Sequence, residues 1–123
     1  MSRRLIFLVA TVSLLTLALA ACGGGSSSGG SAALNINMTA TEFKYDPNVI
    51  NASPGQTINL TVKNTGSVQH TWVLDQGNIK LTIDPGQSAS KTFTAPTAPG
   101  TYQFYCDEPG HKEAGMVGQL VVK

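Results

Sequence analysis

The chain has few charged side chains and no cluster of them that carries one sign. Asp, Glu, Lys and Arg make up 12% of its 123 residues, and the formal net charge is +1. Because proteins bind nucleic acids and anionic lipid surfaces through clustered Lys and Arg, we expect no nucleic acid partner and no membrane binding through charge. Helical periodicity is missing from every long stretch after residue 33, which argues against a helical fold.

One long apolar run is present, and it lies at the N-terminus, from Leu5 to about Ala21, directly after Arg3 and Arg4. A positively charged start, an apolar segment and small residues at its end are typical of a secretory signal peptide. A transmembrane helix is the alternative, but the run is short for a span of about 20 residues and no charged stop follows it. We therefore expect residues 1–21 to be a signal peptide and the protein to be exported.

The apolar run ends in Leu19-Ala20-Ala21-Cys22, which resembles the lipobox of bacterial lipoproteins. The resemblance implies that Cys22 becomes the lipid-modified first residue; an incidental thiol after an ordinary cleavage site is the alternative. Residues 22–33 are rich in Gly and Ser and should form a flexible tether. We therefore expect a protein anchored by lipid to a bacterial membrane, facing the periplasm or the cell exterior.

Cysteine is as scarce as charge, since Cys22 and Cys106 are the only two in the chain. If Cys22 carries lipid, Cys106 is an unpaired thiol in an exported protein. Such a thiol is prone to react unless something is bound to it. A Cys22–Cys106 disulfide is the alternative. The residues near Cys106 are therefore candidates for a binding site.

The remaining residues, 34–123, suffice for one small domain. Apolar and polar residues alternate with period two, as at Ile58, Leu60 and Val62, and Pro-Gly turn signals separate the alternating stretches. This pattern predicts strands at residues 34–42, 48–51, 56–63, 70–75, 79–83, 88–94, 101–106 and 117–122. Seven or eight short strands at this spacing predict an all-β fold, a two-sheet sandwich or flattened barrel.

A thiol, an imidazole and a thioether follow one another at intervals of five residues, as Cys106, His111 and Met116. Pro109-Gly110 between them predicts a tight turn, and the chain's one other histidine, His70, opens a predicted strand. Taken singly, each of these residues is commonly a core or surface residue. Together they are the ligand set of a blue-copper site, whereas structural zinc sites have little use for methionine. Their joint spacing therefore predicts a copper site.

This pattern resembles the cupredoxins, the family that includes plastocyanin, azurin and auracyanin, and the loop spacing is most similar to that of auracyanin. The resemblance extends over residues 43–123, including the segments FKYDPNVINASPGQTINLTVKNTGSVQHTWVL and APGTYQFYC. It implies a Greek-key sandwich that holds one copper ion, with His70, Cys106 and His111 as strong ligands and Met116 as the axial ligand. It also implies a one-electron carrier that cycles between Cu(I) and Cu(II), and not an enzyme.

Two positions depart from the pattern of many cupredoxins, which have Asn after the first histidine and Ser or Thr after the cysteine. Here these second-shell positions are Thr71 and Asp107. A hydroxyl-to-carboxylate hydrogen bond could replace the usual brace between the ligand loops, or Asp107 could simply face water; the sequence leaves both open.

The partners follow from the same resemblance. We expect a monomer that exchanges electrons with redox protein donors and acceptors, among them membrane electron-transfer complexes, through a His111 edge inside an apolar rim. A copper enzyme would need histidines beyond His70 and His111 for a second copper centre. A periplasmic or extracellular copper-binding or copper-delivery protein is the main alternative, and a metal-free adhesive sandwich is the other.

Overall fold

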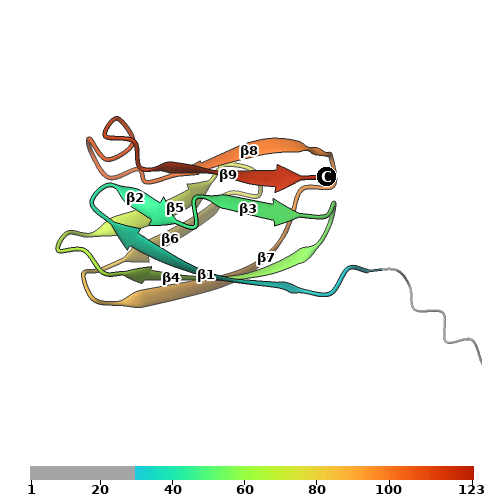
Figure 1. The fold of residues 1–123 in the computed structure, drawn as a ribbon, viewed down its shortest axis with the longest axis horizontal. Helices are drawn as coiled ribbons and strands as arrows, with labels where there is room; N and C mark the ends of the chain where they lie inside the picture. The colour runs from blue at the N-terminus through green and yellow to red at the C-terminus, as the bar shows by residue number, and fades with distance from the viewer. Residues whose placement is uncertain (1–29) are drawn as a thin grey trace, which may run out of the picture.

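The structure, a computed structural model, describes residues 30–123, which form nine strands and their connecting turns (Figure 1). The strands are β1 (Leu34–Thr41), β2 (Lys44–Asp46), β3 (Val49–Ala52), β4 (Thr57–Asn64), β5 (His70–Leu74), β6 (Ile79–Ile83), β7 (Ser88–Thr94), β8 (Gly100–Tyr105) and β9 (Val117–Val122). The predicted signal peptide, Cys22 and most of the predicted tether lie outside the described residues. Among the residues that are described, no helix has the length and apolar character needed to cross a membrane.

The strands form two sheets, in the orders β2-β1-β4-β7 and β3-β9-β8-β5-β6. Strand β1 runs parallel to β4, and β3 runs parallel to β9, whereas the other pairs are antiparallel. Parallel neighbours require connections that leave the strand and return, so the chain passes from one sheet to the other instead of forming a simple meander. The predicted all-β sandwich is confirmed.

Eight predicted strands are present, each with ends within one residue of the prediction. The structure has nine strands in its described part, one more than the upper expected number of eight, because β2 was not predicted. This strand has three residues and a single inward side chain, Tyr45, which is too little for an alternating pattern to be recognised. It pairs with the end of β1, at Thr39 to Thr41.

The core lies between the two sheets and consists of the inward side chains of the alternating strands. Ile58, Leu60 and Val62 of β4 are at most 1% exposed, and Trp72 of β5 is fully buried. The Trp72 ring packs against Phe93 at 5.7 Å and against Phe104 at 5.2 Å between centroids, so it joins the two sheets. Burying each large apolar side chain contributes roughly 1.5 to 3 kcal/mol, which makes the sandwich a rigid support for the loops at its ends.

One end of the sandwich holds the predicted ligands. Strand β8 ends directly before Cys106, and its antiparallel neighbour β5 begins at His70, so both residues reach the same end. Figure 1 shows the β8–β9 loop at the end opposite the C-terminus and the start of β1. At that far end, Gln56 Nε2 donates to the carbonyl of Ala32 at 2.7 Å, which places the entry of the chain away from the predicted site.

Candidate metal centre

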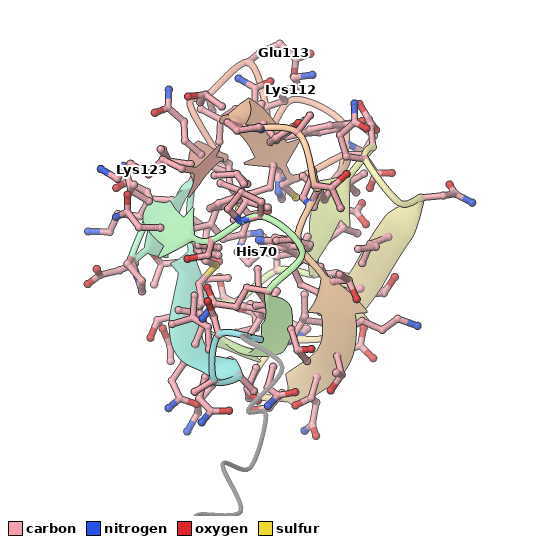
Figure 2. All side chains as sticks on the ribbon, turned by 90° about the vertical axis from the view of Figure 1, so that its right-hand side faces the viewer. His70, Lys112, Glu113 and Lys123 are labelled. Atoms are coloured by element: carbon pink, nitrogen blue, oxygen red, sulfur yellow. The ribbon has the colours of Figure 1, made fainter. Side chains whose placement is uncertain are left out.

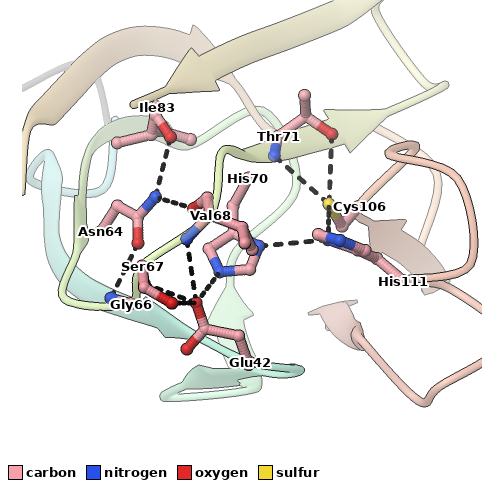
Figure 3. Close-up of polar contacts among 10 residues, drawn as sticks. All are labelled: Glu42, Asn64, Gly66, Ser67, Val68, His70, Thr71, Ile83, Cys106 and His111. Carbon is pink, nitrogen blue, oxygen red and sulfur yellow. Dashed lines mark hydrogen bonds and ion pairs between the residues drawn. The ribbon is translucent and has the colours of Figure 1, made fainter. Parts of the chain in front are cut away.

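Three of the predicted ligands converge at one point. One donor atom from each of His70, Cys106 and His111 lies within 4.8 Å of the others (Figure 3). The Nδ1 atoms of His70 and His111 are 3.2 Å apart, and Cys106 Sγ is 3.4 Å from His111 Nδ1. Donor atoms that share a metal ion at bond lengths of about 2.0 to 2.3 Å, with roughly tetrahedral angles, are about 3.2 to 3.6 Å apart. The two separations that involve His111 therefore fit a shared metal ion, and the His70 and Cys106 donors lie within 4.8 Å of each other.

The loop from Cys106 to Met116 is closed by its own backbone. The Cys106 N–H donates to the Met116 carbonyl at 3.1 Å, and the Met116 N–H donates to the His111 carbonyl at 3.0 Å. Gly110 adopts a φ of 81°, a left-handed conformation that suits glycine, in the turn that follows Pro109. Met116 is fully buried. The backbone thus fixes the spacing between Cys106, His111 and Met116 before any metal binds.

Cys106 lies in a protected environment beneath the loop. Its side chain is fully buried, and its Sγ accepts a hydrogen bond from the Thr71 N–H at 3.3 Å. His70 is also fully buried, and this burial is the main reason that its pKa is lowered. A neutral imidazole is the form that binds metals, so burial prepares His70 for that role.

Thr71 and Asp107 form the hydroxyl-to-carboxylate hydrogen bond that was one of the two alternatives from the sequence. Thr71 Oγ1 donates to Asp107 Oδ1 at 2.7 Å and accepts from the Asp107 N–H at 2.9 Å. The register of β5 and β8, with Val73 opposite Tyr105, brings Thr71 opposite Asp107 when it is continued past the strand end. Lys80 Nζ binds the second carboxylate oxygen at 2.7 Å, and the Lys80 and Thr71 hydrogen bonds hold the pKa of Asp107 below its usual value.

The turn before His70 is held by Asn64, which the sequence analysis did not identify. Its Nδ2 donates to the carbonyls of Val68 at 2.7 Å and Ile83 at 2.9 Å, and its Oδ1 accepts from the Gly66 N–H at 2.9 Å. Asn64 is fully buried. The sequence could have revealed this role. Asn64 continues the alternation of the inward residues Ile58, Leu60 and Val62, and a polar side chain that points into the core needs hydrogen-bond partners there.

Phe43 is another supporting residue that the sequence analysis did not identify. Its ring packs edge-on against the His111 ring, with centroids 4.8 Å apart, and is 41% exposed. His111 itself is partly exposed, and the loop residues Pro109 and Gly110 are exposed. In Figure 2, viewed along the long axis of the sandwich, Lys112 and Glu113 lie at the outer edge of the molecule and His70 lies near its middle. The site therefore reaches the surface through His111.

A buried thiol and two converging imidazoles on an all-β sandwich, with a methionine at the end of the same loop, define a protein with the ligand set of a type 1 copper site. The chain belongs to the family of cupredoxin-like domains, whose model matches residues 6–122. One copper ion is the cofactor that this family and this donor set share.

Individual relatives extend the comparison. Plastocyanin from Vicia faba is 34% identical over 90 residues, which cover 62% of this chain and 84% of that protein. The copper-resistant cuproprotein CopI from Rubrivivax gelatinosus is 28% identical over 102 residues, covering 65% of this chain. The chain spans only 60% of the length of that CopI protein.

Solved structures support the same fold. Dithionite-reduced auracyanin from Roseiflexus castenholzii superposes with a TM-score of 0.66 and 31% identity, over 76% of this chain and 99% of auracyanin. A multicopper oxidase also superposes, with a TM-score of 0.63 over 75% of this chain, but at 21% identity and over 39% of the oxidase. That second likeness shows a shared fold and carries no inference about activity.

Proposed function

We propose that this protein is a one-electron carrier whose redox centre is a single copper ion held by His70, Cys106, His111 and Met116. The observation that carries the proposal is the convergence of three donor atoms within 4.8 Å. When bound, the copper ion would supply one-electron chemistry by alternating between Cu(I) and Cu(II). Each residue's contribution follows from its chemistry and surroundings.

Cys106 would supply a soft thiolate that suits both copper oxidation states, and the two histidines would supply stronger donors than a thioether. Met116 would be the weak axial donor, and its burial keeps water from that position. Because Cys106 and His70 are fully buried and the loop backbone is internally hydrogen-bonded, the ligands have little freedom to move when the charge changes. Such rigidity favours fast electron transfer.

Electrons would enter and leave through the exposed edge of His111. Two exposed side chains provide apolar surface at this end of the sandwich. Phe43 packs beside His111, Val68 lies two residues before His70, and each is 41% exposed. Lys112 and Glu113 carry opposite charges, so long-range steering would be weak. We infer redox protein partners that dock transiently, in interfaces below about 1,200 Å².

The direction in which the chain enters the domain supports a membrane-tethered carrier. Residues 30–33 approach the start of β1, at the end away from the β8–β9 loop (Figure 1). If Cys22 carries a lipid, the tether would therefore leave His111 facing away from the membrane surface. This orientation would allow donors and acceptors to reach the redox centre without competition from the bilayer.

Copper handling is the second candidate, because the CopI relative is described as a copper-resistant cuproprotein. A storage protein gains from binding several ions, whereas the described part of this chain contains one group of converging His, Cys, Asp or Glu ligands. That single group, in which His70 and Cys106 are buried and His111 is partly exposed, favours electron transfer over storage.

A potentiometric titration of the copper-loaded protein tests the proposal. A carrier should give one reversible Nernst curve with n = 1, and stopped-flow mixing with a small redox protein should show rapid reduction and reoxidation. The Cys106→Ser variant is the control that should lose both. Irreversible loss of copper on reduction, or uptake of several ions per chain, would favour copper handling instead.

A further inference from the structure

The two ring nitrogens of His70 face different surroundings. Nδ1 points to the donor cluster, 3.2 Å from His111 Nδ1 (Figure 3). Nε2 is buried and has no partner within hydrogen-bond distance; the dashed line from Nε2 to Glu42 in Figure 3 marks an ion-pair contact. The charged atom beside Nε2 is Glu42 Oε1, at 3.7 Å. A neutral imidazole carries one hydrogen, so a metal on Nδ1 forces that hydrogen onto Nε2. A buried N–H donor of this kind requires an acceptor.

Glu42 is held in position to be that acceptor. It follows the end of β1, and its Oε1 accepts the backbone N–H groups of Ser67 at 2.6 Å and Val68 at 3.1 Å. These residues belong to the turn that leads into His70. The hydrogen bond from the Ser67 N–H is the main cause of the lowered pKa of Glu42. The carboxylate thus joins β1 to the turn and faces the free side of the His70 ring.

The absence of a side chain at Gly66 is independent evidence that the Glu42 carboxylate packs closely against this turn. A Cβ atom at position 66 would overlap the Glu42 carboxylate oxygens and carbon. No positive φ accounts for glycine here, so the space taken by Glu42 is the constraint. A side chain at position 66 would displace the carboxylate from the Ser67 and Val68 N–H groups.

We propose that Glu42 is a positioning residue for His70, whose carboxylate accepts the Nε2–H when Nδ1 binds copper. A contraction of about 0.8 Å brings the 3.7 Å separation to an ordinary N–H···O distance. The carboxylate fixes the tautomer and the ring orientation, and its charge stabilises Cu(II) more than Cu(I). The inference rests on the proposed function, because it assigns a role toward the same copper ion.

The first test compares the full chain with its Glu42→Gln variant. Glutamine keeps the length and a carbonyl acceptor for the turn but removes the charge. Mutation of a histidine's outer hydrogen-bond partner typically weakens metal binding about 10- to 100-fold. We expect Cu(II) affinity to fall about tenfold relative to Cu(I), which raises the midpoint potential by about 59 mV. Glu113→Gln, an exposed glutamate in the ligand loop, is the matched control and should leave the potential unchanged.

Two further measurements separate this role from simple support of the turn. Gly66→Ala, which should displace the carboxylate without altering any charge, should also raise the potential. In the Cu(I) form, NMR of ¹⁵N-labelled protein should show a slowly exchanging Nε2–H on His70 that exchanges faster in Glu42→Gln. An unchanged potential and an unchanged Nε2–H exchange rate in Glu42→Gln would overturn the role of Glu42. Absence of an intense thiolate-to-copper band in the wild-type protein would instead overturn the proposed function, and the role of Glu42 with it.

Discussion

Asp107→Ala tests the brace that joins the two ligand loops, and the structure allows its effect to be estimated. The substitution removes the acceptor of the Thr71 hydroxyl, at 2.7 Å, and the partner of Lys80, also at 2.7 Å. A part-buried hydrogen bond to a charged group contributes about 1.5 kcal/mol. The Lys80–Asp107 pair, with side chains 53% and 36% exposed, adds little because solvent screens it. The metal-free protein should therefore lose about 1.5 kcal/mol, or roughly 6 to 12 °C in Tm for a domain of this size.

The same substitution should raise the midpoint potential of the copper form. Without Asp107, the Thr71 hydroxyl retains one nearby acceptor, Cys106 Sγ, at 3.5 Å. A hydrogen bond to the thiolate draws electron density from the ligand, and removal of a negative charge disfavours Cu(II), so both effects act in the same direction. Each tenfold loss of Cu(II) affinity relative to Cu(I) adds about 59 mV.

Lys80→Met is the matched control, because it removes the ion pair and leaves the Thr71–Asp107 hydrogen bond intact. It should cost little stability, because the ion pair is exposed, and it should lower the midpoint potential, since it removes a positive charge. Denaturant unfolding of the metal-free proteins and voltammetry of the copper forms measure both quantities. The reasoning fails if Asp107→Ala is no less stable than Lys80→Met, or if its potential equals that of the wild type.

The remaining predictions concern two ligands and one packing contact. Cys106→Ser should abolish the intense visible band of the copper form while the sandwich remains folded by circular dichroism; a retained band would remove Cys106 from the ligand set. Met116→Leu should keep copper and raise the potential, because leucine offers no axial donor. An unaltered potential would mean that Met116 is not the axial ligand. Gly118→Ala would bring a Cβ into steric overlap with two Phe104 ring carbons and should cost about 3 kcal/mol or more in denaturant unfolding. Gly100→Ala, whose Cβ meets only ordinary contacts, should cost much less, and equal losses would contradict the packing argument.

The strands were predictable because the information lies in consecutive residues. Ile58, Leu60 and Val62 alternate with polar residues, and each faces the core. Strand β2 escaped detection because it has a single inward residue, Tyr45, and its pairing with the end of β1 becomes apparent only in three dimensions.

The three converging residues were predictable because their types are rare in the chain, which has two histidines and two cysteines. The residues that hold these ligands in position could not be predicted in the same way. Glu42 contacts a turn 25 residues away in sequence, and Lys80 contacts Asp107 across 27 residues. A single Glu or Lys in an alternating stretch has the pattern of a solvated surface residue, and nothing local shows which partner the fold brings to it. Asn64 was the exception, since its inward position could have revealed it.

The most direct test of the central claim is addition of one equivalent of Cu(II) to the purified full chain, followed by visible absorption and electron paramagnetic resonance. The account predicts an intense thiolate-to-copper charge-transfer band and a narrow hyperfine splitting, bleached by ascorbate and restored by an oxidant. A weak band with ordinary splitting, or no binding, would show that His70, Cys106 and His111 do not bind copper together, and would contradict the proposed function.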